Sequence, residues 1–222
     1  MRLNSINSTL AYRYFIINKP YNMVSQFLSP DKVRLLGHLD FDFPEGTHAI
    51  GRLDNHSEGL LILTTNKRVT KLLFESKTPH KRVYLVKVRG EVSEESVQLI
   101  NNGISIRVKG GGDWVTTPCE ARIVPKPEGL FGHPFENPEY CVHTWMEISL
   151  TEGKFHQVRK MTDAIGHRCV RLIRLSIEDL LLGDLQPGMV KEIEETEFFD
   201  LLHIKQWEDE FKLTTRERRM RV

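Results

Sequence analysis

The hydrophobic pattern of the first third of the chain predicts two strands and a short helix. Residues 12–18 are rich in aromatic and β-branched side chains, which favours a strand, and Pro20 ends it because proline has no backbone N–H to donate. A continuous apolar run over 60–65 is typical of a buried strand. Apolar residues at helical spacing then predict a short amphipathic helix over 67–75.

Strand and helix patterns are mixed in the rest of the chain. Side chains alternate in character along 82–90, which predicts a strand with one buried face. Ser93 can cap a helix that ends at Gly103, and a second helix is predicted over 157–167. Further extended segments are predicted over 104–108, 119–124, 144–150 and 169–177, with a glycine-rich hairpin turn at 109–114. Because the order shows no regular βαβ alternation, we expect an α+β fold with a mainly antiparallel sheet.

The composition is that of a soluble globular protein. The chain has 222 residues, of which 40% are hydrophobic and 27% charged, enough for one large domain or two small lobes. Its three cysteines, Cys119, Cys141 and Cys169, are far apart and form no C-x-x-C pair, so neither a disulfide framework nor a zinc site is indicated. Without a signal-peptide pattern or an apolar stretch of membrane-spanning length, we expect a cytoplasmic protein.

Charge is balanced overall but unevenly distributed. The formal net charge is +1, which gives no global positive field. Acidic residues cluster over 192–200, whereas the segment from 150 to 175 is locally basic through Lys154, Arg159, Lys160, Arg168, Arg171 and Arg174. A segment of this kind can bind a polyanion, although it is also common on an ordinary solvated face.

Two segments carry candidate chemistry, and the usual motifs of P-loop NTPases, dinucleotide-binding proteins, α/β-hydrolases and zincins are absent from the sequence. GRLDNHSEGLLILTTN (51–66) places Asp54 in a glycine-flanked loop, where an aspartate often does no more than form a turn. EGKFHQVRK (152–160) places His156, Gln157 and Arg159 at the start of a helix. There they can hold an anion or a base edge, or face solvent as a simple cap.

Together these segments resemble the pseudouridine synthases. The first resembles their catalytic G-R-L-D motif followed by S-x-G-L-L, and the second resembles their later glycine-to-arginine motif. FIINKPYNMVSQF, RVYLV and RLIRLSI resemble three further family segments in the expected order, so the resemblance spans about residues 13–204. The motif forms are similar to the RsuA/RluB/RluE/RluF branch. The first strand begins about a dozen residues into the chain, which leaves no room for an S4-type RNA-binding domain and is most similar to the RluE type, a large-subunit ribosomal RNA enzyme.

The resemblance implies a fold and a domain organisation. The pseudouridine synthase fold is α+β, with a mixed, mainly antiparallel central sheet in two lobes and a catalytic cleft between them. We expect a flexible N-terminus (1–11), a catalytic domain (12–205) and a basic C-terminal tail (206–222). The expected partner is ribosomal RNA, as the large subunit or its precursor particle, and the expected state is a monomer. No metal or other cofactor is implied, because substrate and product are isomers.

The resemblance also implies roles for particular residues. Asp54 is the catalytic carboxylate, Arg159 pairs with it, and Tyr84 packs against the uracil. Asp54 can attack C1′, attack C6 of the base or remove the proton from C2′, and all three roles stay open. The enzyme is expected to flip the target uridine out of folded RNA. Contacts with that nucleotide or with neighbouring phosphates are implied for Arg52, Lys154, His156, Gln157, Arg171 and Arg174.

Some features depart from the family pattern or allow other interpretations. Arg82 stands where the family usually has lysine, His156 follows Phe155 where Asn-Arg is common, and Asn22 replaces a usual glycine. A nucleosidase or glycosidase would instead pair Asp54 with Glu58. A pseudouridine synthase that acts on 16S ribosomal RNA or on another RNA is a further alternative. A non-catalytic RNA-binding or ribosome-assembly protein would keep the basic segment without needing Asp54. The Pro- and Gly-rich stretch 125–140 is interpreted as an insertion rather than a lid.

Overall fold

The computed structural model describes residues 11–74, 78–133, 141–205 and 207. The predicted N-terminal segment, apart from residue 11, and the predicted basic tail, apart from residue 207, lie outside the described residues. The elements, in chain order, are β1 (Tyr14–Lys19), η1 (Leu36–His38), β2 (His48–Ile50), β3 (Glu58–Thr64), α1 (Val69–Phe74), β4 (Arg82–Arg89), α2 (Glu94–Asn101), β5 (Ser105–Arg107), β6 (Asp113–Val115), β7 (Glu120–Val124), β8 (His143–Leu150), α3 (Gln157–Ala164), β9 (Cys169–Ile177), β10 (Leu180–Leu181), β11 (Val190–Ile193) and α4 (Glu195–Leu201).

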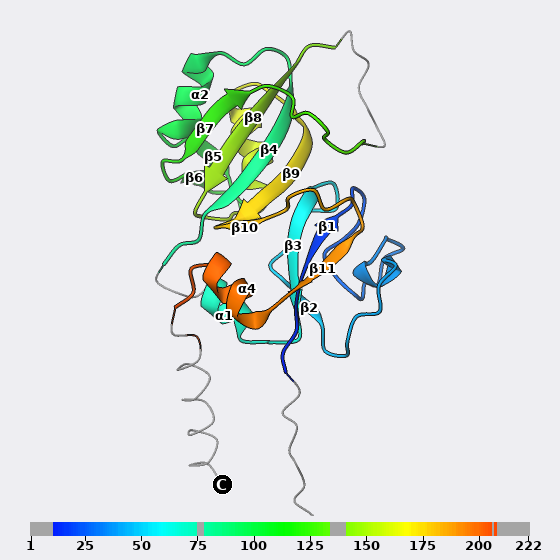
Figure 1. The fold of residues 1–222 in the computed structure, drawn as a ribbon. Coiled ribbons are helices and arrows are strands. Elements are labelled where there is room, and N and C mark those ends of the chain that lie inside the picture. Colours follow the sequence, from blue (N-terminus) through cyan, green and yellow to red (C-terminus); the bar gives the residue numbers. More distant parts are fainter. Residues whose placement is uncertain (1–10, 75–77, 134–140, 206, 208–222) are drawn as a thin grey trace, which may run out of the picture.

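One twisted sheet runs through both lobes (Figure 1). Its strand order is β11-β1-β3-β9-β4-β8-β7, with β2 added to β3 and β10 to β9. Within the described residues every pairing is antiparallel except that of β3 with β9, where Glu58 and Gly59 lie beside Ile173 and Arg174. The predicted mainly antiparallel α+β sheet is therefore confirmed, and its short parallel pairing joins the two lobes.

The first lobe buries both faces of its central strands, β1 and β3. Every residue of these two strands is buried. On one face α1 and α4 cover the sheet, and Phe198 of α4 stacks on Tyr14 with ring centroids 4.6 Å apart. On the other face the segment between β1 and β2 contributes Met23 and Leu36 to a second cluster. Two-sided burial explains why β3 has a continuous apolar run rather than an alternating one.

The second lobe packs α2 and α3 against β4, β8 and β9. Ser93 caps α2 as predicted, since its side chain accepts a hydrogen bond from the backbone N–H of Ser96 at 3.3 Å. The prediction of one buried face for 82–90 is wrong near the centre of β4, where neighbouring Leu85 and Val86 are both buried. Leu85 belongs to a cluster with Trp145 that covers the opposite face of the sheet.

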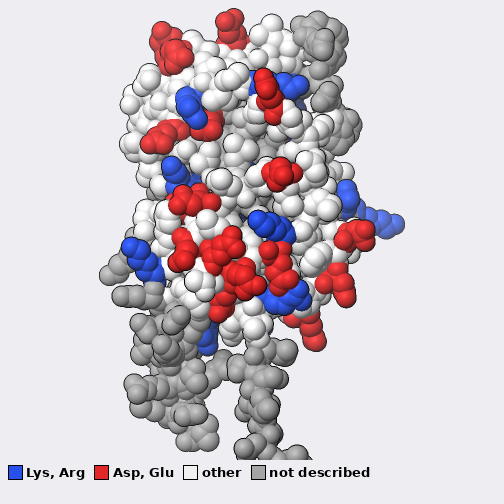
Figure 2. Space-filling model, viewed as in Figure 1, with Lys and Arg blue, Asp and Glu red and all other residues white. Residues whose placement is uncertain are grey.

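The predicted glycine-rich turn is a hairpin turn, between β5 and β6. Gly110 and Gly111 have φ angles of 107° and 94°, a region that glycine enters without steric cost. The predicted acidic cluster lies on β11 and α4, where acidic side chains gather on the face of the first lobe (Figure 2). None of these acidic residues lines the cleft described below.

Candidate active site in the cleft between the lobes

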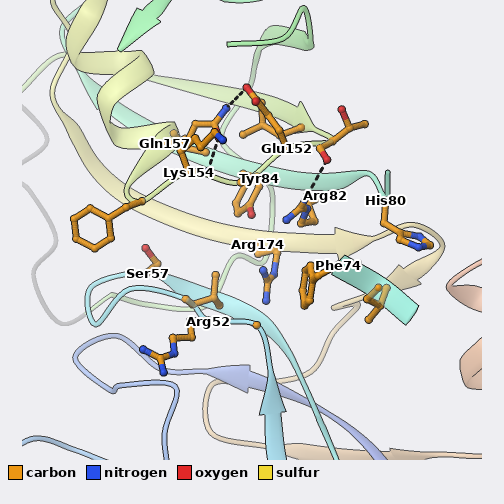
Figure 3. Close-up of a pocket in the computed structure, with 18 of the residues that line it drawn as sticks. Arg52, Ser57, Phe74, His80, Arg82, Tyr84, Glu152, Lys154, Gln157 and Arg174 are labelled. Atoms are coloured by element: carbon orange, nitrogen blue, oxygen red, sulfur yellow. Dashed lines mark hydrogen bonds between the residues drawn. The ribbon is translucent and has the colours of Figure 1, made fainter. Parts of the chain in front are cut away.

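A cleft of about 760 Å³ lies between the two lobes. Its walls come from the loop before β3 and the end of α1 on one side, and from β4, the 150–158 segment and β9 on the other (Figure 3). Its lining includes Arg52, Asp54 and Phe74 from the first lobe and Tyr84, Lys154 and Arg174 from the second. The cleft therefore collects most of the site residues that the sequence predicted.

Asp54 lies in a loop that is fixed on both sides. The Ser25 hydroxyl donates to the carbonyl of Leu53 and accepts from the Leu53 N–H, both at 2.9 Å. After the aspartate, the Ser57 N–H donates to the Asp54 carbonyl at 3.0 Å. The Asp54 carboxylate keeps 29% of its side-chain surface exposed. A turn and an accessible carboxylate thus coexist at this position.

Lys19 supports the same loop from beneath. Its ammonium is fully buried and donates to the carbonyls of Pro20, Met23 and Asn55 at 2.9, 2.6 and 3.4 Å. Burial lowers the pKa of Lys19 to about 7, although the negative charges of Glu58 and Asp54 act to raise it. Lys19 therefore ties the end of β1 to the residue after Asp54.

Two cationic or potentially cationic side chains reach Asp54 from the second lobe. Arg159 Nε lies 3.9 Å from Oδ2, and His156 Nε2 lies 3.4 Å from Oδ1. Arg159 also donates through Nη2 to the carbonyl of His56 at 2.8 Å and to the Ser57 hydroxyl at 3.3 Å. One turn of α3 thus brings Arg159 to the loop that carries Asp54, as the resemblance implied.

The start of α3 has an unusual backbone that directs His156. His156 is the N-cap residue with φ 56° and ψ 30°, a left-handed conformation that is uncommon for residues other than glycine. Its side chain makes no capping hydrogen bond. Gln157 acts locally instead: its Oε1 accepts from the Lys154 N–H at 2.8 Å and its Nε2 donates to Glu152 at 2.8 Å. Gln157 lines the cleft but is only 4% exposed, and its predicted contact with RNA stays a prediction.

Tyr84 and Arg174 form the floor of the cleft. The hydroxyl of Tyr84 points toward the Arg174 guanidinium (Figure 3). Arg174 is only 4% exposed and donates from Nε to the Leu60 carbonyl at 2.8 Å. Burial lowers the pKa of Arg174, and its interaction with Tyr84 opposes that shift. Tyr84 therefore offers its ring to the cleft while its polar end faces a buried cation.

Arg171 does not reach the surface of the cleft. It forms a two-point ion pair with Glu58, with Nε–Oε2 at 2.9 Å and Nη2–Oε1 at 3.0 Å, and both side chains are less than a tenth exposed. The predicted basic track from Lys154 through Arg171 and Arg174 along the cleft is therefore wrong at Arg171, whereas Arg174 lines the cleft floor but is only 4% exposed. Glu58 is also neutralised by Arg171, which argues against pairing it with Asp54 in a nucleosidase.

Arg52 and Lys154 are exposed at the rim, where the predicted phosphate contacts require them to be. Lys154 Nζ lies 3.9 Å from the centroid of the Trp114 ring on β6. Glu152 joins the same hairpin to the cleft, since Oε1 accepts from the Thr117 N–H at 3.0 Å and Oε2 accepts from Trp114 Nε1 at 3.2 Å. Sequence reasoning missed these hairpin contacts, which bring together segments more than thirty residues apart.

Part of the 125–140 stretch packs beside the loop that carries Asp54. His133 makes an edge contact with Tyr21, with ring centroids 4.6 Å apart, and Tyr21 stacks on His56 at 5.1 Å. Phe131 accepts a hydrogen bond from Arg171 at its carbonyl, at 3.0 Å. Residues 134–140 lie outside the described residues, so the choice between insertion and lid stays a prediction.

Among the described residues, no group of three or more His, Cys, Asp or Glu side chains is arranged to hold a metal ion. None of the described helices has both the length and the apolar content to cross a membrane.

Comparison with known proteins identifies the family. Residues 13–164 match the family described as RNA pseudouridylate synthase. The chain is 34% identical to Ribosomal large subunit pseudouridine synthase E of Vibrio parahaemolyticus over 82% of this chain and 74% of that protein. It is 35% identical to the protein of the same name from Vibrio vulnificus over 83% and 77% of the two chains. A crystal structure of a pseudouridylate synthase superposes with a TM-score of 0.69 at 26% identity, covering 86% of this chain and 74% of that one. These names agree with the predicted RluE type, and the chain belongs to the RNA pseudouridylate synthase family.

Proposed function

We propose that this protein converts a uridine of large-subunit ribosomal RNA into pseudouridine, with Asp54 as the catalytic carboxylate. The single observation that carries the proposal is the Asp54 carboxylate, exposed in the interlobe cleft and approached by Arg159 at 3.9 Å and His156 at 3.4 Å. Family membership supports the reaction, and the names of the two Vibrio relatives support the large subunit as the substrate. We assign the catalytic unit to residues 12–205.

The reaction requires one bond to break and another to form at the same sugar carbon. The C1′–N1 bond of uridine breaks, the uracil rotates, and C1′ bonds to C5. The C5 proton is then lost and N1 gains a proton, so atoms balance without any co-substrate. If C1′–N1 ionises first, C1′ acquires oxocarbenium character, which a neighbouring carboxylate stabilises.

Asp54 is positioned to act on the sugar or the base of a flipped nucleotide. Its carboxylate can attack C1′, attack C6 or remove the C2′ proton. The charge of Arg159 faces Oδ2 at 3.9 Å, and its direction is fixed because the same guanidinium donates a hydrogen bond to the carbonyl of His56. Such positioning is effective because the reaction slows by orders of magnitude when the reactive group is displaced by about 1 Å.

The target uridine has to leave the RNA helix before it can enter the cleft. Enzymes that modify bases extrude the nucleotide into a pocket and stack it against aromatic or apolar side chains. Tyr84 is the aromatic residue on the cleft floor, and we assign it to packing against the uracil. Arg52 and Lys154 at the rim are assigned to the flanking phosphates, where a positive charge is favourable.

The proposal is tested with purified protein and RNA labelled with tritium at C5 of its uridines. Conversion to pseudouridine releases the tritium to water, because C5 loses its proton. The substrates are deproteinised 23S and 16S ribosomal RNA from cells that lack the protein. Wild type should release tritium from 23S RNA, and Asp54→Asn should be slower by on the order of 10³-fold. Asp40→Asn, an exposed carboxylate outside the cleft, is the matched control.

Each alternative predicts a different result. Release from 16S RNA alone would overturn the large-subunit assignment. Free uracil as the product would indicate a nucleosidase. Binding of RNA without tritium release from either substrate would indicate a non-catalytic RNA-binding protein.

A further inference from the structure

The cleft continues beyond the catalytic residues to an aromatic side chain that has no role in the proposed chemistry. Phe74, the last residue of α1, lines the same cleft as Asp54 and Tyr84. It leaves 46% of its surface exposed, although it is a large apolar residue. His80 and Arg82 lie on the same side of the close-up as Phe74 (Figure 3). We call Phe74 and Arg82 the second subsite.

The Phe74 ring is held against the backbone of the catalytic loop. A Cβ placed on Gly51 would lie 2.9 Å from Phe74 Cζ, so the ring edge rests directly on this glycine. Gly51 has a φ of 71°, which a residue with a side chain adopts only under strain. Gly51 is three residues before Asp54, a separation of at most about 11 Å along the chain. The exposed ring therefore rests on the loop that carries Asp54, and both residues line the same cleft.

Arg82 places a planar cation beside this ring. Its guanidinium carbon lies 6.0 Å from the Phe74 ring centroid. Nη2 donates to the Thr151 carbonyl at 3.0 Å, which fixes the guanidinium to the second lobe. Phe74 belongs to the first lobe, so the second subsite spans the cleft from wall to wall, as the catalytic residues do.

The charges around the second subsite favour a polyanion. Arg52 and Lys154 are exposed on the same cleft. Glu152 is the one carboxylate other than Asp54 among the described cleft-lining residues, and both its oxygens accept hydrogen bonds from the protein. His80 is buried, and its Nδ1 lies 3.2 Å from the Glu178 carboxylate. Glu178 does not line the cleft, so its negative charge is not presented there.

We propose that Phe74 and Arg82 bind an unpaired nucleobase of the RNA strand, next to the uridine that occupies the catalytic end. This inference rests on the proposed function and extends it to the strand that flanks the target. Single-stranded RNA is bound by stacking its bases on exposed aromatic rings and on arginine planes within a basic groove. Stacking tolerates every base, so this subsite holds the strand in place without selecting its sequence.

The test separates stacking from packing at residue 74. Phe74→Leu keeps an apolar side chain over Gly51 but removes the aromatic face, whereas Phe74→Trp keeps an aromatic face. Arg82→Lys keeps the charge but removes the planar guanidinium. Tyr12→Leu is the control, because Tyr12 is an aromatic residue with 41% exposure that does not line the cleft.

Two readouts are used on deproteinised 23S ribosomal RNA: kcat and KM from tritium release, and Kd from filter binding, which needs no turnover. Phe74→Leu should raise KM and Kd by about 5- to 150-fold, the range that corresponds to loss of one stacked base. Its kcat should stay within about twofold of wild type. Phe74→Trp should restore most of the binding, Arg82→Lys should weaken it less than Phe74→Leu does, and Tyr12→Leu should leave it unchanged.

The results distinguish failure of this inference from failure of the proposed function. If wild type converts 23S RNA but Phe74→Leu has unchanged KM and Kd, the second subsite is refuted and the proposed function stands. If wild type releases no tritium from 23S RNA, the proposed function fails, and the Kd series alone decides the second subsite. A fall in kcat and in thermal stability for both Phe74→Leu and Phe74→Trp would show that the ring is structural, and would also overturn the inference.

Discussion

Replacing Glu58 with glutamine leaves the Arg171 guanidinium buried beside a neutral amide. The native pair has two hydrogen bonds, at 2.9 and 3.0 Å, and its side chains are 7% and 3% exposed. Removing one member of such a pair costs about 3–5 kcal/mol, because the remaining charge has lost its partner without regaining water. Glutamine still offers one oxygen as an acceptor, so we expect the free energy of unfolding to fall by about 3 kcal/mol, at the low end of this range. In a chain of this size that corresponds to a fall in Tm of about 6–12 °C.

The assay is urea unfolding of Glu58→Gln, Arg171→Met and the double variant, with kcat measured well below the melting temperature. The double variant should recover part of the stability, since it no longer buries a charge without a partner and keeps only the neutral glutamine amide at the site. Each folded variant should keep kcat within a few-fold of wild type, because Glu58 lies beneath the cleft rather than in it. A loss of stability below about 1 kcal/mol would refute the buried-pair argument. A collapse of kcat with normal stability would instead support a nucleosidase-like pairing of Glu58 with Asp54.

Three further outcomes follow from the same structure. Gly59→Ala should destabilise the protein by about 2–4 kcal/mol in urea unfolding, because a Cβ on Gly59 would overlap the Arg174 carbonyl and lie 2.7 Å from the Arg174 backbone nitrogen, and because Gly59 has a φ of 98°. Gly183→Ala is the control: Gly183 has open space around it, so this variant should lose much less stability. Arg159→Lys should lower kcat about 10- to 100-fold with little change in KM, because an ammonium cannot contact Asp54 and the carbonyl of His56 as the guanidinium fork does; an unchanged kcat would show that charge alone suffices. Burial lowers the pKa of Lys19 to about 7, so between pH 7 and about pH 10.4 the unfolded chain binds more protons than the folded one, and the free energy of unfolding should rise by up to about 1.4 kcal/mol per pH unit. Urea titrations of wild type and Lys19→Met should diverge over that pH interval, and parallel curves would contradict the pKa shift.

The elements that the sequence predicted correctly are those specified by local signals. The apolar run of β3, the cap at Ser93 and the glycine turn of the β5–β6 hairpin each depend on neighbouring residues. The short elements β2, β10 and β11 were not predicted. β11 pairs Ile193 with Tyr14, a contact between the two ends of the described chain that no local pattern encodes.

The same difference between local and long-range signals applies to the residues of the candidate site. The pairing of Asp54 with Arg159 was implied by the family resemblance, whereas periodicity alone left Asp54 as a possible turn residue. The burial of Arg171 could not be predicted, because it depends on the parallel pairing of β3 with β9, which brings Glu58 of β3 beside Arg171 of β9. Phe74 belonged to a predicted amphipathic helix, and nothing in that pattern indicates that its ring faces the cleft.

The most direct test of the central claim is a pseudouridine map of 23S and 16S ribosomal RNA by carbodiimide-blocked reverse transcription. The RNA comes from cells that lack the protein and from the same cells rescued with wild type or with Asp54→Asn. The account predicts that a 23S stop disappears in the deletion and returns with wild type but not with Asp54→Asn. Identical maps in all strains, or a stop restored by Asp54→Asn, would contradict the assignment of Asp54 as the catalytic carboxylate of a ribosomal RNA pseudouridine synthase.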